Sequence, residues 1–264
     1  MIKAGWILFM PRDYDPWDLY KRYAEIGYKV QDSDLSRLPG DLGENYKRYT
    51  DLGLTPITVG CPNVIADADV KGIIARAKAQ NITRVTMFGS SILRRDERSN
   101  AQMYDDFMGD IEAINGLIPV LAEEGLTFAY HNHFQEFTNY FKGAAAFEHM
   151  LIKCDPRLSF DLDVGWASVG GQDPVKLMQR LQGRIAAIHL KDFFDLEHAK
   201  LPNDTRYGFT SLGSGAVNLA GVIEEMDKQK IPYGIVEQDM MRNLDNFEAI
   251  EASYLRMKES GFFE

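Results

Sequence analysis

The chain is poor in cysteine and has no long apolar run. Its two cysteines, Cys61 and Cys154, lie far apart among 264 residues. A disulfide framework or a cysteine-based zinc site needs more cysteines at closer spacing, so both are excluded and we expect a reducing, cytoplasmic environment. No apolar stretch approaches the ~20 residues that cross a bilayer, and the N-terminus lacks a signal-peptide pattern, so we expect no contact with a membrane.

Basic charge is also scarce. The sequence has 29 basic and 39 acidic residues, which gives a net charge of −10. Such a field repels a phosphate backbone, so general nucleic-acid binding is not expected. Clusters of acidic residues can bind divalent metals, and a negative net charge does not exclude small sugars as ligands.

Eight apolar, strand-like runs follow one another along the chain. Few of them alternate strictly with polar residues, which is typical of buried parallel strands. The runs are Ile2–Phe9, Tyr28–Gln31, Thr55–Val59, Arg84–Phe88, Thr127–His131, Leu158–Asp163, Ala186–Leu190 and Tyr233–Glu237.

Helical segments separate these runs. Asp15-Pro16 and Asp173-Pro174 each place a capping residue before a proline, which is a typical helix start. Several helices end at a glycine, as at Gly27, Gly53 and Gly125, where the left-handed conformation of a helix cap is needed. The other expected helices are Leu42–Asp51, Ala68–Ala79, Ala101–Glu123, Ala144–Lys153, Leu219–Lys228 and Asn246–Glu259.

Eight strands that alternate with eight helices predict an α/β fold, a closed (β/α)8 TIM barrel that forms a single domain over residues 1–264. The alternative is an open doubly wound sheet. That fold usually has a glycine-rich phosphate loop after its first strand, whereas residues 10–15 contain no glycine.

The residue types at the strand ends indicate where chemistry occurs, because barrel enzymes work at the carboxyl ends of their strands. The first four runs end without an evident cluster, at Phe9, Gln31-Asp32, Val59-Gly60 and Phe88-Gly89. The last four end in metal-capable groups: His131-Asn132-His133, Asp161 with Asp163, His189 with Lys191, and Glu237 with Asp239.

Imidazoles and carboxylates at four consecutive strand ends predict one divalent metal ion, Mn, Mg, Zn or Co, because a cation neutralises carboxylates that share a pocket. Asp163 is preferred over Asp161 as a ligand because it lies nearer the mouth. Trp166 could stack on a sugar or be a core aromatic. Lys191 could stabilise an enolate or only pair with Asp192 or Glu237. His149 and His198 are expected to be solvated.

At these residues the chain resembles the xylose isomerase-like TIM-barrel superfamily of sugar phosphate isomerases and epimerases, whose relatives include inosose dehydratases and the endonuclease IV group. The resemblance covers essentially the whole chain. Its most specific pieces are residues 163–166 (DVGW), 184–192, 213–215 (GSG) and 236–239 (VEQD).

The resemblance implies one metal ion held by Glu, Asp, His and Glu after the last four strands. Asp163, His189 and Glu237 match the last three of these ligands. His131 stands where relatives carry the first Glu, and His133 fits a histidine of the dehydratase-like relatives. The expected metal ligands are therefore His131, Asp163, His189 and Glu237.

The activity implied is that of a metal-dependent isomerase or epimerase, which removes a proton next to the carbonyl of a keto-sugar or cyclic polyol. Glu237, His133 and Lys191 are the expected catalytic residues, and Trp166, Glu136 and Asp239 the expected substrate contacts. Since His131 replaces a glutamate, a dehydratase or lyase is a near-equal alternative.

An endonuclease IV-like DNA repair enzyme would need three metals, more histidines and a basic groove. A further alternative is a binding protein whose barrel has lost its catalytic activity, and such a protein would hold no metal. The expected partner is a small sugar or polyol, with no nucleic acid, and assembly into a homo-oligomer is left open.

Overall fold

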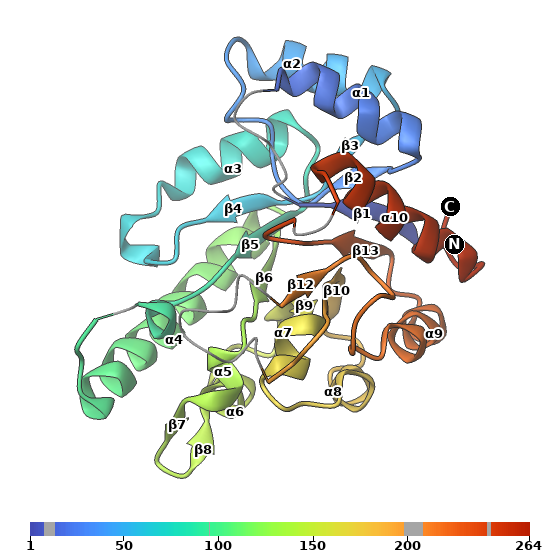
Figure 1. Cartoon of the computed structure of the whole chain (residues 1–264). Helices are drawn as coiled ribbons and strands as arrows, with labels where there is room; N and C mark the ends of the chain where they lie inside the picture. The colour runs from blue at the N-terminus through green and yellow to red at the C-terminus, as the bar shows by residue number, and fades with distance from the viewer. Residues whose placement is uncertain (8–13, 95, 198–207, 242–243) are drawn as a thin grey trace.

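A curled sheet of parallel strands with helices packed against its outer face forms the structure (Figure 1). The computed structural model describes residues 1–7, 14–94, 96–197, 208–241 and 244–264. The last two residues of the first expected strand and His198 lie outside these ranges. Within them, no helix is long and apolar enough to cross a membrane.

The sheet closes on itself through its third strand. Its order is β3-β2-β1-β13-β10-β9-β6-β5-β4, and β3 and β4, at the two ends of this order, are separated only by Ile57 and Thr58. The strands are β1 Lys3–Trp6, β2 Val30–Gln31, β3 Thr55–Pro56, β4 Val59–Cys61, β5 Arg84–Met87, β6 Thr127–His131, β9 Ser159–Asp163, β10 Ile185–Leu190 and β13 Tyr233–Val236.

The predicted TIM barrel is therefore confirmed, and the open doubly wound sheet is wrong. β3 pairs with β2, and β4 pairs with β5, so the run Thr55–Cys61 acts as one strand that changes partners midway. Ile57 continues the first pairing, because its N–H donates to the carbonyl of Gln31 at 2.9 Å. That residues 1–264 fold as one domain stays a prediction.

The helices follow the strands in the expected order. Asp15 and Asp173 cap their helices, and each accepts hydrogen bonds from backbone N–H groups in the first turn. The long helices are α1 Pro16–Ile26, α2 Leu42–Asp51, α3 Val70–Ala79, α4 Asn100–Glu123, α6 Ala146–Lys153, α8 Pro174–Arg180, α9 Leu219–Gln229 and α10 Asn246–Glu259.

Shorter elements follow the strands that carry the expected site. Helix α6 starts two residues later than predicted, because Ala144 and Ala145 pair with the preceding segment as β8. The short elements are η1 Ile65–Asp67, η2 Ser91–Leu93, α5 Gln135–Thr138, β7 Tyr140–Phe141, β8 Ala144–Ala145, α7 Val164–Val169, β11 Asp192–Phe193 and β12 Phe209–Thr210.

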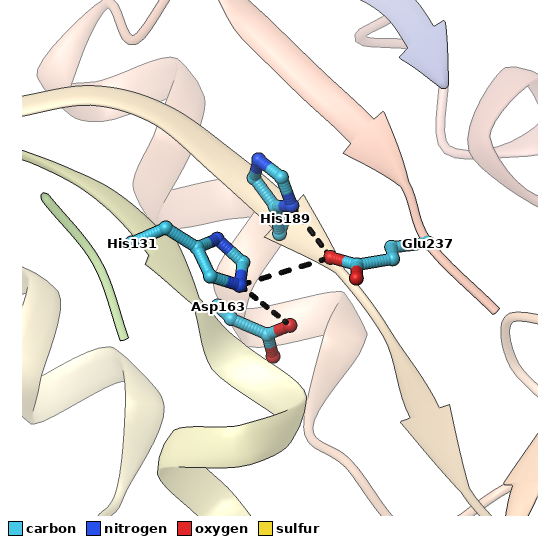
Figure 2. Close-up of side chains that lie close together, drawn as sticks. All are labelled: His131, Asp163, His189 and Glu237. Carbon is cyan, nitrogen blue, oxygen red and sulfur yellow. Dashed lines mark hydrogen bonds and ion pairs between the residues drawn. The ribbon is translucent and has the colours of Figure 1, made fainter. Parts of the chain in front are cut away.

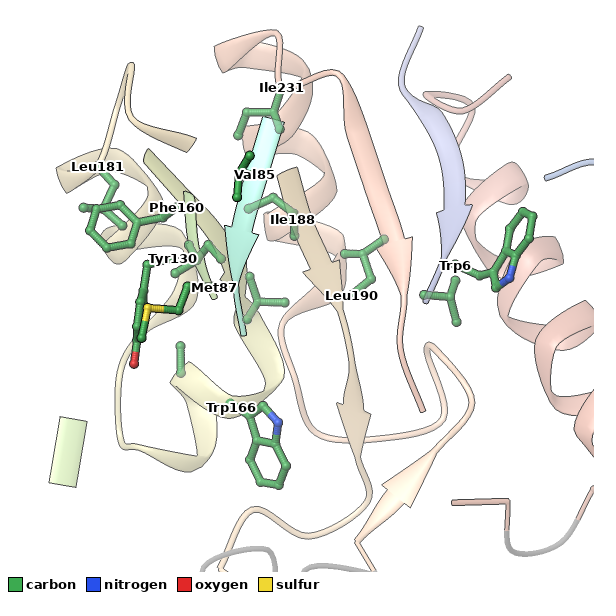
Figure 3. Packing of buried hydrophobic residues seen from close by; sticks show 14 of the residues in the cluster. Trp6, Val85, Met87, Tyr130, Phe160, Trp166, Leu181, Ile188, Leu190 and Ile231 are labelled. Carbon is green, nitrogen blue, oxygen red and sulfur yellow. The ribbon is translucent and has the colours of Figure 1, made fainter. Parts of the chain in front are cut away.

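Along each strand, successive side chains face the helices and the barrel interior in turn. Val85, Phe160 and Leu190 belong to the large core between the sheet and the helices (Figure 3). Their neighbours Arg84, Asp161 and His189 have the opposite parity, so they face the interior. The polar residues of the strands are thereby gathered inside the ring.

The lower interior of the barrel is filled by a small apolar cluster of Ile7, Val30, Ile57, Ala187 and Ile235. Gly5 makes room for it, since a Cβ atom there would lie 2.5 Å from Val30 Cγ2 and 2.6 Å from Ile235 Cδ1. This packed floor leaves the carboxyl end of the barrel for polar residues.

Candidate metal centre

Four neighbouring strands bring two histidines and two carboxylates to one point. His131 ends β6, Asp163 ends β9, His189 lies near the end of β10, and Glu237 directly follows β13. These strands are adjacent and parallel in the order β13-β10-β9-β6, so their carboxyl ends lie at the same edge. Figure 2 shows the four side chains turned toward one another.

The distances within this group suit a single cation. His131 Nε2 lies 4.0 Å from Asp163 Oδ2 and 3.9 Å from Glu237 Oε2, and His189 Nδ1 lies 2.7 Å from Glu237 Oε2. One candidate ligand atom from each residue lies within 4.8 Å of the others. We call His131, Asp163, His189 and Glu237 the metal cluster.

The donor set also fits a divalent metal. All four residues are buried, and Asp163 Oδ2 has no hydrogen-bond partner among the described residues, although Lys191 Nζ lies 3.2 Å from it. A buried carboxylate oxygen without a hydrogen bond is costly, and a cation satisfies it. Mixed imidazole nitrogens and carboxylate oxygens are ligands that Zn²⁺, Mn²⁺ and Co²⁺ share.

The protonation states divide the cluster into neutral and charged members. Burial, reinforced by the neighbouring His189, holds the pKa of His131 well below its usual range, so this ring is neutral. Burial also opposes the charge on His189, but hydrogen bonds to Asp32 and Glu237 outweigh it and raise the pKa of His189 to about 10. A metal that binds His189 Nδ1 must therefore displace a proton.

The two carboxylates of the cluster differ as well. Burial raises the pKa of Asp163 to about 6, although the charge of Lys191 opposes this shift. Burial would raise the pKa of Glu237 too, but Lys191 and His189 outweigh it and lower that pKa well below its usual range. Glu237 is thus ionised at any pH near neutrality.

Lys191 supplies a fixed positive charge beside the cluster. Its side chain is 1% exposed, and Nζ lies 3.2 Å from Asp163 Oδ2, 3.1 Å from Glu237 Oε1 and 3.3 Å from Asp239 Oδ2. Burial would lower the pKa of Lys191, but these carboxylates outweigh it and raise that pKa. The expected ion pair with Glu237 is present.

The expected alternative partner of Lys191, Asp192, has a different role. Its carboxylate accepts the backbone N–H groups of Gly213, Gly215 and Val217 at 2.9 to 3.1 Å. A Cβ atom on Gly215 would lie 2.3 Å from Asp192 Oδ1, so only glycine permits this approach. Asp192 therefore anchors the segment that follows β12.

His133 and Trp166 line the region next to the metal cluster. The His133 ring centroid lies 5.0 Å from that of His131 and 6.0 Å from that of Trp166. Burial and the charge of Lys191 lower the pKa of His133 to about 4, so it is neutral. Trp166 is 6% exposed and packs on Phe193, as a core aromatic would, while Lys191 Nζ lies 4.8 Å from its ring centroid.

The two other expected substrate contacts lie in different surroundings. Glu136 is fully buried, and its carboxylate accepts hydrogen bonds from the Tyr130 hydroxyl at 2.5 Å and the His133 N–H at 2.9 Å. Both oxygens are thus used inside the fold, which leaves a substrate contact of Glu136 without support. Asp239, with 42% of its side chain exposed, faces Lys191.

Two expectations from the sequence were wrong. His149 is not solvated, because on α6 it is buried and its Nε2 lies 2.8 Å from the carbonyl oxygen of Phe141. The end of the second strand was expected to contribute to no cluster, but Asp32 there is fully buried and its Oδ2 lies 2.8 Å from His189 Nε2. The carboxylate directly after a strand was the available signal, and its partner could not be read from the sequence.

A cavity of about 630 Å³ lies near the metal cluster, but no residue of the cluster lines it. Asp32 and Phe88 line the cavity and also contact the metal cluster. Asp32 contacts His189, and the Phe88 ring centroid lies 5.5 Å from that of His131. The other walls come from segments after β1, β2 and β4, including Ser33, Asp34, Asn63 and Arg76.

Comparisons with known proteins agree with this architecture. The sequence pattern of a family described as xylose isomerase-like TIM barrel matches residues 64–253, more than half of the chain. No curated protein matches the chain in sequence. Solved structures resemble it over nearly their whole length.

A sugar phosphate isomerase/epimerase from Parabacteroides distasonis has a TM-score of 0.77 at 21% identity, with 100% of this chain and 96% of that chain covered. The probable 3-DHS dehydratase AsbF from Bacillus anthracis has a TM-score of 0.75 at 14% identity, with 97% and 99% covered. The IOLI protein, solved with a zinc atom, has a TM-score of 0.74 at 15% identity, with 100% of both chains covered. At these identities the likeness supports the fold.

Proposed function

The chain belongs to the xylose isomerase-like TIM-barrel family, and from this premise we propose that it is a divalent-metal-dependent sugar isomerase or epimerase. The observation that carries the proposal is the metal cluster, whose four residues come from adjacent strands and place their ligand atoms within 4.8 Å of one another. The substrate is a keto-sugar or a cyclic polyol with a carbonyl group.

The proposed ligands are His131 through Nε2, Asp163, His189 through Nδ1, and Glu237. A divalent cation held there would polarise the carbonyl and the adjacent hydroxyl of the substrate. Glu237 is ionised and His133 is neutral, so either can accept the proton that leaves the carbon next to the carbonyl. Lys191 stays protonated and donates a hydrogen bond to a substrate oxygen that gains negative charge.

The cavity beside the cluster gives the substrate its place. Its volume of about 630 Å³ lies within the range of ~300–1,000 Å³ that is usual for small-molecule pockets. Asp32 and Phe88, which line this cavity, contact His189 and His131, so we propose that part of the sugar lies on this side of the cluster. Trp166 and Asp239, which both lie beside Lys191 Nζ, stay proposed substrate contacts.

A second candidate, a dehydratase or lyase, is favoured by the imidazoles. A two-base epimerase uses one carboxylate to take a proton and another to return it, but His131 stands at the position of the first. His133 lies directly beside this ring and is neutral, so it could transfer the proton that accompanies loss of water. The same metal cluster would serve either reaction.

Incubation of the metal-loaded protein with keto-sugars and inososes in D₂O tests the two candidates. Deuterium in a recovered isomer supports the isomerase or epimerase, and an unsaturated product supports the dehydratase. Glu237→Gln should abolish either reaction. Glu148 lies on the outer helix α6, where it pairs with Arg180 of α8, so Glu148→Gln should leave the activity unchanged. Absence of exchange and of product with every substrate would refute both.

A further inference from the structure

Behind the metal cluster lies a second group of buried charges that the proposed reaction does not use. It consists of Asp32 after β2, Arg84 on β5 and Asp161 on β9, and all three side chains are buried. Arg84 Nη2 donates to Asp32 Oδ1 at 2.5 Å, and Arg84 Nη1 lies 3.4 Å from Asp161 Oδ1. Asp161 also accepts a hydrogen bond from the Thr86 hydroxyl at 2.6 Å.

This group touches the metal cluster at a single ring. Asp32 Oδ2 lies 2.8 Å from His189 Nε2, while Glu237 Oε2 lies 2.7 Å from Nδ1 of the same ring. A carboxylate accepts hydrogen bonds but cannot donate them, so the nitrogen that faces Asp32 must carry the hydrogen. In a neutral imidazole the other nitrogen, Nδ1, then has the free lone pair, and Nδ1 is the atom that faces the cluster.

Arg84 keeps Asp32 in this role. Its guanidinium occupies one oxygen of Asp32 and directs the other toward His189. It also fills the space between Asp32, Asp161 and His189, whose ligand atoms lie close enough together to bind a metal of their own. Arg84 therefore already places a positive charge beside Asp32 and Asp161, which disfavours a divalent ion between them.

We propose that Asp32, held by Arg84, is a positioning residue that fixes His189 as an Nδ1 metal ligand. The proposal rests on the metal site of the proposed function and adds to it a residue that is not itself a metal ligand. Partners of this kind commonly change metal affinity by ~10–100-fold. In Asp32→Asn the side chain keeps its size but exchanges one acceptor for an N–H donor, so it can no longer accept from both His189 and Arg84.

Titration with Zn²⁺, followed by calorimetry, tests the proposal. Asp32→Asn should bind Zn²⁺ about 10–100-fold more weakly than the wild type. The matched control is Asp34→Asn, because Asp34 lies two residues further along and pairs with Arg76 at 3.5 Å, away from His189. Its affinity should stay within about twofold of the wild type, since it contacts no residue of the cluster.

A second measurement reads the binding mode of His189 in the wild-type protein, so it does not depend on how Asp32→Asn folds. With ¹⁵N-labelled histidine and bound Zn²⁺, one imidazole should have a metal-bound Nδ1 and a protonated Nε2, and this signal should vanish in His189→Gln. Unchanged affinity in Asp32→Asn, or a His189 ring bound through Nε2, would overturn the proposal alone. Absence of Zn²⁺ binding by the wild type would overturn the proposed function as well.

Discussion

Lys191→Met should destabilise the metal-free protein strongly and the metal-loaded protein much less. The ammonium group of Lys191 lies 3.1 to 3.3 Å from three carboxylates and is 1% exposed, so its loss leaves buried negative charge without a partner. Removal of one partner from a buried ion pair typically costs about 3–5 kcal/mol. Methionine retains most of the apolar stem, so the loss of charge dominates.

A bound divalent cation neutralises two of the same carboxylates, Asp163 and Glu237. At a metal concentration ~1,000 times its Kd, binding stabilises the folded state by about 4 kcal/mol. The cation no longer meets a neighbouring ammonium group in Lys191→Met, so its stabilising effect should be larger in the variant than in the wild type. We therefore expect metal to restore more than half of the stability lost.

Urea unfolding, followed by circular dichroism with EDTA and with saturating Mn²⁺, measures both effects. Lys176→Met is the matched control, because Lys176 is 83% exposed and lies 3.7 Å from Asp173. Exposed pairs of this kind contribute about 0–1 kcal/mol, so the control should change little in either condition. The reasoning would be refuted by an equal loss of stability with and without metal, or by no loss in EDTA.

Two further predictions concern pH. Metal affinity should rise about tenfold per pH unit between pH 6 and 9, because binding displaces the proton of His189, whose pKa is about 10. Below pH 6 the affinity should change more steeply with pH, because Asp163, whose pKa is about 6, is then protonated as well. Competition with a chelator at several pH values measures this, and a constant affinity between these limits would contradict it. Burial raises the pKa of Glu136 to about 7 in the folded protein, against ~4.3 when unfolded. This group should therefore cost the wild type up to about 4 kcal/mol of stability as pH rises between these values. Glu136→Gln should remove that loss in urea unfolding at pH 4.5 and 8, and an identical pH profile in the variant would count against it.

The sequence predicted the barrel because the signal was repeated at every strand and helix. Each apolar run, each capping residue such as Asp15 and Asp173, and each closing glycine pointed to the same alternation. The third strand differed most in detail, since Thr55–Val59 was expected as one element and is divided into β3 and β4. The division depends on which neighbour each half meets, which is set by barrel closure and not by local sequence.

That these four side chains converge was predictable for a similar reason. Parallel strands align their ends, so His131, Asp163, His189 and Glu237 had to meet once the strand order was right. Asp32 was not recognised, because a single carboxylate after a strand gives no sign of its partner. Arg84 was hidden as well, since a charged residue that begins an apolar run suggests an exposed end, whereas here Arg84 is 5% exposed.

The divided third strand also affects how the barrel can move. Around the ring, β3 and β4 lie opposite β10, which carries His189. Each half of the divided strand has a strand partner on one side only, so fewer backbone hydrogen bonds must break there for a brief local opening than elsewhere in the ring. The barrel can thus fluctuate at this point while the four strands that carry the metal cluster keep their register.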